Sequence, residues 1–244
     1  MGIYVGFDIG GTKCAAVTGI EKDGELTILG REAFATPADQ QEALDRLCAL
    51  AKKLAGGQEI LGIGISSGGP MDADKGELCN PPNLPGWHGI SLTDYAQQKL
   101  HAPALLENDA NACALVEWKL GAGRGCSDMI FLTMGTGMGG GIIAEGKLLR
   151  GCTDMGGEIG HLRLEKDGPV GFGKAGSFEG FTSGGGIQRQ ARALTEKMVR
   201  EGRTSAWVRD GHGPEEADAK LLAAYARAGD ADAKDFFDHI GTML

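Results

Sequence analysis

Short apolar runs recur along the chain and predict buried β-strands. Four of these runs have the length of a strand and are followed by glycine or polar residues, namely 3–7, 14–18, 60–65 and 129–132. Residues 25–34 predict a further strand, and residues 142–149 predict two short strands joined by a turn at Glu145-Gly146. Strands are therefore expected in both halves of the chain.

Residues with helical periodicity lie between the strands. Thr36-Pro37 is typical of a helix start and Gly56-Gly57 of a helix end. The apolar residues between these two signals share one face: Leu44, Leu47, Cys48, Ala51 and Leu54. A helix after Asp109 would turn four further residues toward the core: Ala112, Leu115, Val116 and Leu120. Because strands alternate with helices, the sequence predicts an α/β fold.

The residues beyond 182 predict helices with one polar interruption. Ser183 is expected to cap a helical run over 187–199, and the glycines at 184–186 could approach a ligand. Residues 201–213 are polar and contain glycine, which indicates a surface loop. Two alanine-rich helices are predicted after it, at about 214–228 and 230–244.

A glycine-rich loop follows the strand at 129–132. Its glycines, at 135, 137, 139, 140 and 141, allow positive φ and let backbone N–H groups approach a ligand closely. N–H groups turned into one concavity form an anion site, most often for phosphate. The loop contains G-x-G-x-x-G, but the residues after it predict a strand, whereas a dinucleotide site needs a helix there. We expect a phosphate-binding hairpin; a tight hairpin without a ligand is the alternative for this loop alone.

The segment Asp8-Ile-Gly-Gly-Thr-Lys13 repeats this arrangement, since a turn again joins two apolar strands. Thr12 and Lys13 could donate to phosphate oxygens, and Asp8 could hold a hydrated Mg²⁺ ion. Ordinary turn chemistry would explain Asp8 and Thr12 equally well if the segment stood alone. Because two such segments occur, we expect both to bind one phosphate tail.

Asp109 carries the clearest candidate chemistry. A short apolar strand ends in Glu107-Asn108-Asp109, and open α/β sheets bind ligands at the carboxyl ends of their strands. The positive end of the following helix would keep the Asp109 carboxylate ionised and ready to accept a hydroxyl proton. Asn108 can both donate to and accept from a sugar hydroxyl. A structural role for Asp109, as N-cap of that helix, is equally compatible with the sequence.

Two other segments hold candidate polar groups. The proline-rich run 79–89 suits a stiff rim that presents Asn83 to a polyhydroxylated ligand while Trp87 packs, but the residues alone favour a plain surface turn. Glu158 and His161 are three residues apart and would share one face of a helical turn. A lone histidine is more often structural than a ligand, so the residues alone favour a structural role for His161.

Composition narrows the classes of function. The chain has 24 Lys and Arg against 33 Asp and Glu, and this net charge of −9 argues against nucleic acid or an anionic membrane as the main partner. No apolar stretch approaches the roughly 20 residues of a membrane span, and the first residues lack the basic region of a signal peptide. The six scattered cysteines are typical of small core residues in a reducing compartment. We therefore expect a cytoplasmic protein.

Four segments taken together resemble the ROK family of sugar kinases: 8–13, 107–111, 134–141 and 156–161. The resemblance implies an actin-like ATPase (ribonuclease H-like) fold with two α/β domains, 1–108 and 109–244, around a cleft where ATP and sugar meet. It implies ATP-dependent phosphorylation of a hexose, glucose first, to its 6-phosphate. It also suggests a homodimer.

The same resemblance assigns roles to residues of this sequence. Asp109 would be the catalytic base for the sugar hydroxyl. The residues that would bind sugar are Gly69, Asn83, Asn108, Glu158, His161 and Glu179. Those that would bind the ATP phosphates are Asp8, Gly10, Gly11, Thr12, Lys13, Gly135, Thr136, Gly137 and Gly139. Phosphoryl transfer depends on positioning and charge neutralisation, which two N–H-rich loops, Mg²⁺ and one carboxylate could supply.

The sequence departs from the family at a zinc motif, C-G-C-G-x-x-G-C-x-E. The aligned run is Val170-Gly-Phe-Gly-Lys-Ala-Gly-Ser-Phe-Glu179, with valine, phenylalanine and serine at the three thiolate positions. A structural zinc ion normally needs four ligands, and His161 alone cannot hold one. We therefore expect no zinc, with Val170 and Phe172 packing in its place.

A second departure concerns length, because family members continue past the position of Leu244 with further sheet and a final helix. We expect either a partial chain or an incomplete nucleotide domain. One alternative function is a sugar-binding protein without catalysis, which the retained Asp109 disfavours and the missing C-terminal elements favour. Another is a sugar-sensing regulator, which would need a helix-turn-helix ahead of Asp8. A nucleotide-dependent oxidoreductase is disfavoured by the hairpin after Gly141.

Overall fold

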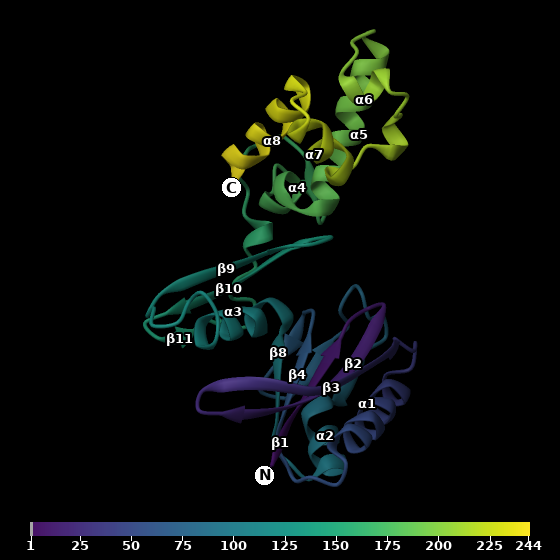
Figure 1. The fold of residues 1–244 in the computed structure, drawn as a ribbon. Helices are drawn as coiled ribbons and strands as arrows, with labels where there is room; N and C mark the ends of the chain where they lie inside the picture. Colours follow the sequence, from purple (N-terminus) through teal and green to yellow (C-terminus); the bar gives the residue numbers. More distant parts are fainter. Residues whose placement is uncertain (1) are drawn as a thin grey trace. The chain divides into compact units, whose positions relative to one another are not determined.

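The computed structural model describes residues 2–244 and divides them into two units (Figure 1). The first unit holds the chain up to Phe131 together with Gly141–Gly157, and the second holds Leu132–Gly140 and Glu158–Leu244. The chain therefore passes between the units three times. The domain boundary expected between residues 108 and 109 stays a prediction.

A five-stranded mixed sheet is the centre of the first unit, in the order β3-β2-β1-β4-β8. Its strands are β1 (Ile3–Ile9), β2 (Lys13–Lys22), β3 (Glu25–Ala35), β4 (Ile60–Ser67) and β8 (Ala104–Asn108). Strand β2 runs antiparallel to both β1 and β3, whereas β4 and β8 run parallel to β1. The predicted strands in this half of the chain are confirmed. The parallel pairing places Asp8, Ser66 and Glu107 in one row across the sheet.

Helices α1 (Gln40–Ala55) and α2 (Leu92–Leu100) pack onto this sheet through one apolar core. Four of the five residues predicted for the inner face of α1 are buried and Leu54 is partly buried: Leu44, Leu47, Cys48, Ala51 and Leu54. The predicted end at Gly56 is confirmed, with φ of 58°. The predicted start at Thr36 is wrong. Asp39 caps the helix instead, because its side chain accepts from the N–H of Glu42 at 2.9 Å.

The rest of the first unit contains short strands and one helix. A small sheet is formed by β5 (Met71–Asp72), β6 (Glu77–Cys79) and β7 (His88–Ser91), and the loop between β6 and β7 buries Trp87 as predicted. Strands β10 (Met138–Ala144) and β11 (Lys147–Leu148) form the predicted hairpin, and β9 (Met129–Met134) pairs with β10. The last residues of β9 and the first residues of β10 belong to the second unit, which holds Leu132–Gly140. Both turn residues have positive φ, 51° at Glu145 and 70° at Gly146.

Helix α3 (Asp109–Lys119) turns a different face inward from the one predicted. Its buried residues are Ala110, Asn111 and Ala114, whereas Val116 is 53% exposed. The reason lies at Gly141, where an added Cβ would be 2.5 Å from the Cβ of Ala114. A glycine in the strand lets the helix approach closely, so small side chains fill the contact that larger ones were expected to make.

The second unit is mainly helical. It contains a 3₁₀ turn (Ile159–His161), the hairpin β12 (Val170–Gly171) and β13 (Lys174–Ala175), a second 3₁₀ turn (Pro214–Glu216), and the helices α4 (Phe178–Thr182), α5 (Gly184–Arg200), α6 (Ala206–Arg209), α7 (Ala219–Arg227) and α8 (Ala231–Met243). Ser183 caps α5 as predicted, accepting from the N–H of Gly186 at 2.9 Å. The helices predicted in the last thirty residues are confirmed as α7 and α8.

The segment 201–213 differs from the surface loop that was predicted. It contains α6, and Trp207 on that helix is fully buried and donates through Nε1 to Thr195 Oγ1 at 3.0 Å. The indole belongs to the core of this unit together with Met198, Leu222 and Phe236. Burial of one large apolar side chain therefore packs an otherwise polar segment against the core of this unit.

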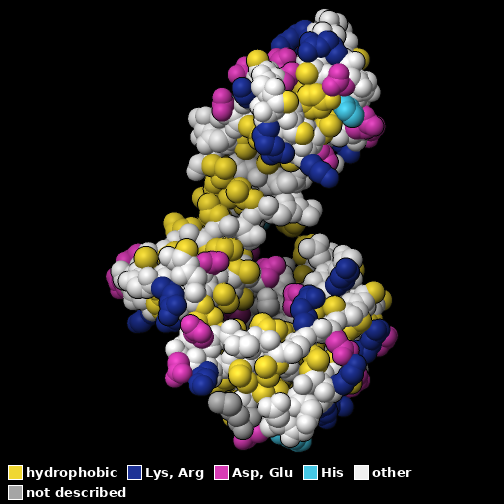
Figure 2. All heavy atoms as spheres, in the orientation of Figure 1, with side chains coloured by type: hydrophobic (Ala, Val, Ile, Leu, Met, Phe, Trp, Pro, Cys, Tyr) yellow, Lys and Arg dark blue, Asp and Glu magenta, His cyan; other side chains and the backbone are white. Residues whose placement is uncertain are grey.

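Surface features agree in part with the composition. Lys and Arg side chains are interspersed with Asp and Glu on the face in Figure 2, without a large basic patch there. Among the described helices, none is long and apolar enough to cross a membrane. All six cysteines are free thiols, and Cys14 and Cys48 are buried. The other four are exposed, so the prediction that the cysteines are core residues is wrong for Cys79, Cys113, Cys126 and Cys152.

Candidate functional site

The carboxyl ends of three parallel strands meet at one edge of the sheet in the first unit. Asp8 and Ile9 of β1 pair with Ser66 and Ser67 of β4, which pair in turn with the end of β8. Gly69 lies just beyond β4, and a Cβ added there would be 3.8 Å from the amide nitrogen of Asn108. The fold thus brings three predicted elements together: the turn after β1, Gly69 and the Asn108-Asp109 pair.

The turn after β1 is held by a residue whose role was not predicted. The N–H of Gly10 donates to the carbonyl of Lys13 at 3.0 Å, which closes the turn. Thr36 donates twice, through its N–H to the Thr12 carbonyl at 3.0 Å and through Oγ1 to the Gly10 carbonyl at 2.5 Å. Thr36, expected to start a helix, therefore holds the turn in place. Gly11, Thr12 and Lys13 are exposed.

Asn83 lies against the same turn. A Cβ at Gly11 would be 2.5 Å from the Asn83 carbonyl and 2.9 Å from its Cβ, so only glycine allows this approach. A residue predicted to bind sugar and a turn predicted to bind phosphate are therefore direct neighbours within the first unit.

The junction between β8 and α3 separates two roles that the sequence left open. The helix is capped by Asn108, whose Oδ1 accepts from the N–H groups of Ala110 at 2.9 Å and Asn111 at 3.2 Å. The prediction of Asp109 as N-cap is wrong, because the strand ends one residue earlier and Asn108 keeps extended backbone angles. Asp109 is the first helical residue and is exposed, with Oδ1 near the N–H of Ala110 at 2.9 Å. Its carboxylate is thus placed at the positive end of α3.

Glu107 and Arg150 support this junction, and neither role was predicted. Arg150 donates to Glu107 Oε2 at 2.6 and 2.8 Å, and Glu107 Oε1 accepts from the amide of Asn111 and the N–H of Asn108, both at 3.1 Å. The Glu107 side chain is only 13% exposed, so this ion pair is partly protected from solvent. An arginine 43 positions away gives no local sequence signal.

Two carboxylates, those of Asp8 and Asp109, lie near the Cys113 thiol at this edge. The pKa of the Cys113 thiol, one turn along α3, is raised by partial burial and then by the negative charges of Asp109, Asp8 and Glu117. Asp8 and Asp109 thus both lie near this thiol, and Arg31 pairs with Asp8 at 3.8 Å. Two carboxylates at one edge fit a hydrated Mg²⁺ ion, which needs one or two protein carboxylates besides phosphate oxygens and water.

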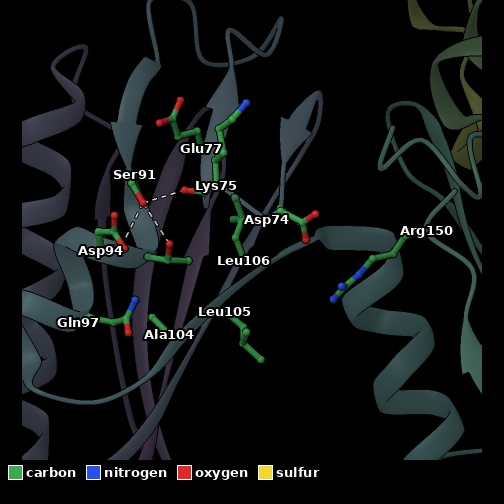
Figure 3. A pocket seen from close by; sticks show the side chains of 12 residues that line it. Asp74, Lys75, Glu77, Ser91, Asp94, Gln97, Ala104, Leu105, Leu106 and Arg150 are labelled. Carbon is green, nitrogen blue, oxygen red and sulfur yellow. Dashed lines mark hydrogen bonds between the residues drawn. The ribbon is translucent and has the colours of Figure 1, made fainter. Parts of the chain in front are cut away.

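A cavity of about 500 Å³ lies elsewhere in the first unit (Figure 3). It is lined by residues of α2, β6 and β8, with Arg150 at one side, and Ser91 on its wall donates to the Lys75 carbonyl at 2.8 Å. The predicted site residues do not line it. Since it lacks the glycine-rich backbone and the strand-end carboxylate, we assign it no part in phosphoryl transfer.

The glycine-rich loop in the second unit is held by α5 and by Glu179. The N–H of Gly184 donates to the Gly135 carbonyl at 2.8 Å, and the N–H of Gly185 donates to the Thr136 carbonyl at 3.2 Å. Glu179 Oε2 accepts from the N–H of Met138 at 3.1 Å. One oxygen of a residue predicted to bind sugar therefore contacts the loop predicted to bind phosphate.

Glu158 and His161 are close, as their spacing predicted. The 3₁₀ turn brings Glu158 Oε2 within 3.7 Å of His161 Nε2, with both side chains partly exposed. The predicted site residues thus form two sets. The turn 8–13, Gly69, Asn83, Asn108 and Asp109 lie in the first unit, and the loop 135–139, Glu158, His161 and Glu179 lie in the second.

Comparison with known proteins identifies the protein family to which this chain belongs. A model of the ROK family matches residues 4–244. A glucokinase of Thermotoga maritima is 34% identical over 241 residues, covering 98% of this chain and 74% of that protein. An N-acetylmannosamine kinase of Shigella boydii is 38% identical over 214 residues, covering 86% of this chain and 70% of that protein. The crystal structure of a ROK family glucokinase from Streptomyces griseus, in complex with glucose and AMPPNP, has a TM-score of 0.71 and 33% identity over 99% of this chain and 76% of that one.

The fold is the actin-like ATPase fold of the ROK sugar kinases, and the chain is a sugar kinase. The chain belongs to the ROK family.

Proposed function

We propose that this chain transfers the γ-phosphoryl group of ATP to the 6-hydroxyl of a hexose, with glucose as the first candidate and Asp109 as general base. The observation that carries the proposal is that Asn108 and Asp109 have different roles at the β8–α3 junction. Asn108 caps the helix, which leaves the exposed Asp109 carboxylate at the helix N-terminus for chemistry. The glucokinases among the relatives favour glucose.

In this mechanism the Asp109 carboxylate accepts the proton of the sugar hydroxyl as that oxygen bonds to the γ-phosphorus and ADP leaves. The Asp109 carboxylate lies in the first turn of α3, and the positive end of a helix dipole attracts negative charge. The groups that would orient the sugar are those of Gly69, Asn83, Asn108, Glu158, His161 and Glu179. Because Asn108 Oδ1 holds the helix, we expect its amide nitrogen to donate to the sugar.

The ATP phosphates would be held by the two glycine-rich segments. In the first, the N–H of Gly10 closes the turn, so we expect the exposed Gly11, Thr12 and Lys13 to be the main donors. In the second, the groups would be those of Gly135, Thr136, Gly137 and Gly139. Mg²⁺, for which Asp8 is the proposed carboxylate ligand, would neutralise phosphate charge.

The test is Asp109→Asn, which keeps size and polarity but removes the base. General-base catalysis contributes about 10²–10⁴-fold, so kcat should fall by that range with little change in melting temperature. Asp94→Asn is the matched control, since Asp94 also lies in the first turn of a helix in the same unit. Unchanged sugar-dependent ADP release in Asp109→Asn would contradict the assignment.

A panel of sugars tests the substrate. The N-acetylmannosamine kinases among the relatives make this sugar the second candidate, so the panel should contain glucose, mannose, fructose, allose, N-acetylglucosamine and N-acetylmannosamine. Phosphorus NMR of the product would show whether oxygen 6 carries the phosphoryl group. A cytoplasmic location and a homodimer stay predictions.

A further inference from the structure

The hairpin β12–β13 and its flanks occupy the stretch where the family resemblance places a zinc site. Val170 and Phe172, at two of the three thiolate positions, are 49% and 68% exposed, whereas Ser177, at the third, is fully buried. The expected packing of both apolar side chains is therefore only partly found, since Phe172 meets His161 and Val170 stays half exposed.

The hydroxyl of Ser177 is occupied by backbone groups. It accepts from the N–H of Gly171 and from the N–H of Gly180, both at 3.1 Å, and lies 3.4 Å from the Gly171 carbonyl as a donor. A serine hydroxyl offers one donor and two acceptor sites, so these contacts use its full capacity. Ser177 therefore joins the hairpin to the start of α4 by hydrogen bonds.

The backbone itself fills the interior of this segment. A Cβ at Gly171 would be 2.5 Å from the backbone nitrogen of Gly180, and one at Gly176 or Gly180 would collide with the carbonyls of Glu165 or Pro169. Within residues 2–244, no group of three or more His, Cys, Asp or Glu side chains could hold a metal ion. The residues present thus do not fit a tetrahedral zinc centre, which needs four nitrogen, sulfur or oxygen ligands.

His161 is nevertheless held from three sides. The ring of Phe172 meets the imidazole edge-on, with centroids 5.2 Å apart and an interplanar angle of 86°. Lys174 Nζ donates to the His161 carbonyl at 2.5 Å, and the Glu158 carboxylate is 3.7 Å from Nε2. Phe172 has φ of 46°, a conformation uncommon outside glycine.

We propose that the 170–177 hairpin positions His161 without a metal ion, Phe172 by contact with the ring and Lys174 by its bond to the backbone. Phe172 is then a positioning residue that orients the imidazole for a sugar hydroxyl. The role of His161 toward sugar rests on the proposed function, whereas its positioning rests on the contacts above.

The first experiment measures metal content and stability of the purified chain. We expect no stoichiometric zinc, and the same melting temperature with and without EDTA. Stoichiometric zinc, with a chelator that lowers the melting temperature, would overturn the metal-free assignment, and this readout does not depend on activity.

The second experiment compares Phe172→Leu with Val170→Ala, the matched change at the neighbouring thiolate position. Phe172→Leu should shift the ring resonances of His161 in NMR spectra and raise the sugar KM by roughly three- to tenfold, with kcat and the ATP KM unchanged. Phe172→Tyr keeps an aromatic ring, so its His161 resonances and sugar KM should match those of the parent chain. Val170→Ala should likewise leave the His161 resonances and the sugar KM unchanged.

The outcomes separate the two proposals. Unchanged His161 resonances in Phe172→Leu would overturn the positioning role. Shifted resonances with an unchanged sugar KM in an active kinase would support the positioning and contradict the assignment of His161 as a sugar ligand.

Discussion

The turn at 8–13 and the loop at 135–139 are both short glycine-rich connections between strands, and the chain holds each with different groups. In the first, the hydroxyl and N–H of Thr36 bind two turn carbonyls. In the second, the first N–H groups of α5 bind two loop carbonyls, and the carboxylate of Glu179 binds a loop N–H. Two segments of similar sequence therefore depend on distant residues of unrelated chemistry.

The glycines of the two segments also make room for different neighbours. Gly11 lies against the backbone of Asn83, which cannot move without moving its loop. Gly137 lies against the carboxylate end of Glu179, a flexible side chain. The difference teaches that a glycine's tolerance of substitution depends on what it faces, and this can be measured.

Among the residues that hold the two glycine-rich segments, Glu179 has the largest expected effect. Removal of a charged acceptor costs about 1.5–3 kcal/mol, so Glu179→Ala should lower kcat/KM by about 10- to 150-fold. In Glu179→Gln the amide oxygen can still accept from the Met138 N–H, so the ATP KM should stay close to that of the parent chain. Steady-state kinetics with varied ATP and with varied sugar would distinguish Glu179→Ala from Glu179→Gln. Equal ATP KM values for both variants would break the proposed link between Glu179 and the loop.

The next largest effect is a difference in unfolding free energy between Gly11→Ala and Gly137→Ala. The first places a methyl group 2.5 Å from the Asn83 carbonyl and should cost about 1–3 kcal/mol of unfolding free energy. The second places it 2.9 Å from Glu179 Oε2, which can rotate away, and should cost less than the first. Urea denaturation measures both, with Gly64→Ala as the control, since an added Cβ there meets nothing within 4 Å. A larger loss in Gly137→Ala would reverse the comparison.

A smaller effect is expected at Thr36. Thr36→Val keeps the shape and removes the hydroxyl that donates to Gly10, which should cost about 1 kcal/mol and raise the ATP KM. Thr242→Val is the control, because its hydroxyl also donates to a backbone carbonyl, that of Asp238, but on an exposed helix end. Identical ATP KM values in the two variants would argue that the backbone hydrogen bonds hold the turn without the Thr36 hydroxyl.

The smallest effect concerns the negative charge of Asp109 and the reactivity of the Cys113 thiol. Asp109 is one of the groups that raise the pKa of Cys113, so Asp109→Asn should lower that pKa and increase the thiolate fraction near neutral pH. Alkylation of Cys113 by N-ethylmaleimide should then be a few-fold faster, measured by mass spectrometry with the exposed Cys126 as internal control. An unchanged rate would show that the two groups are not coupled.

The features that could be predicted from the sequence depend on short-range rules. The hairpin turn at Glu145-Gly146 needed two residues that accept positive φ, and both lie in one dipeptide. The end of α1 at Gly56 and the cap of α5 at Ser183 were likewise local. The approach of Glu158 to His161 followed from their spacing alone.

The features that could not be predicted depend on distant partners. Asn108 and Asp109 are both good capping residues, and only the last residue of β8 decides which one caps α3. The alanine face of α3 is selected by Gly141, 27 residues beyond Ala114. Arg150 pairs with Glu107, 43 positions earlier in the sequence. The glycines and the strand ends indicated a site, but the groups that hold it were set by tertiary contacts.

The two buried indoles are intrinsic fluorescent probes, one in the core of each unit. Trp87 lies in the core of the first unit and Trp207 in that of the second, while Trp118 donates to the Cys126 carbonyl in a more exposed setting. With Trp118→Phe as background, a further Trp87→Phe or Trp207→Phe leaves a single emitter in one unit. The wavelength of its emission during a urea titration would then report whether the two units melt together or one after the other.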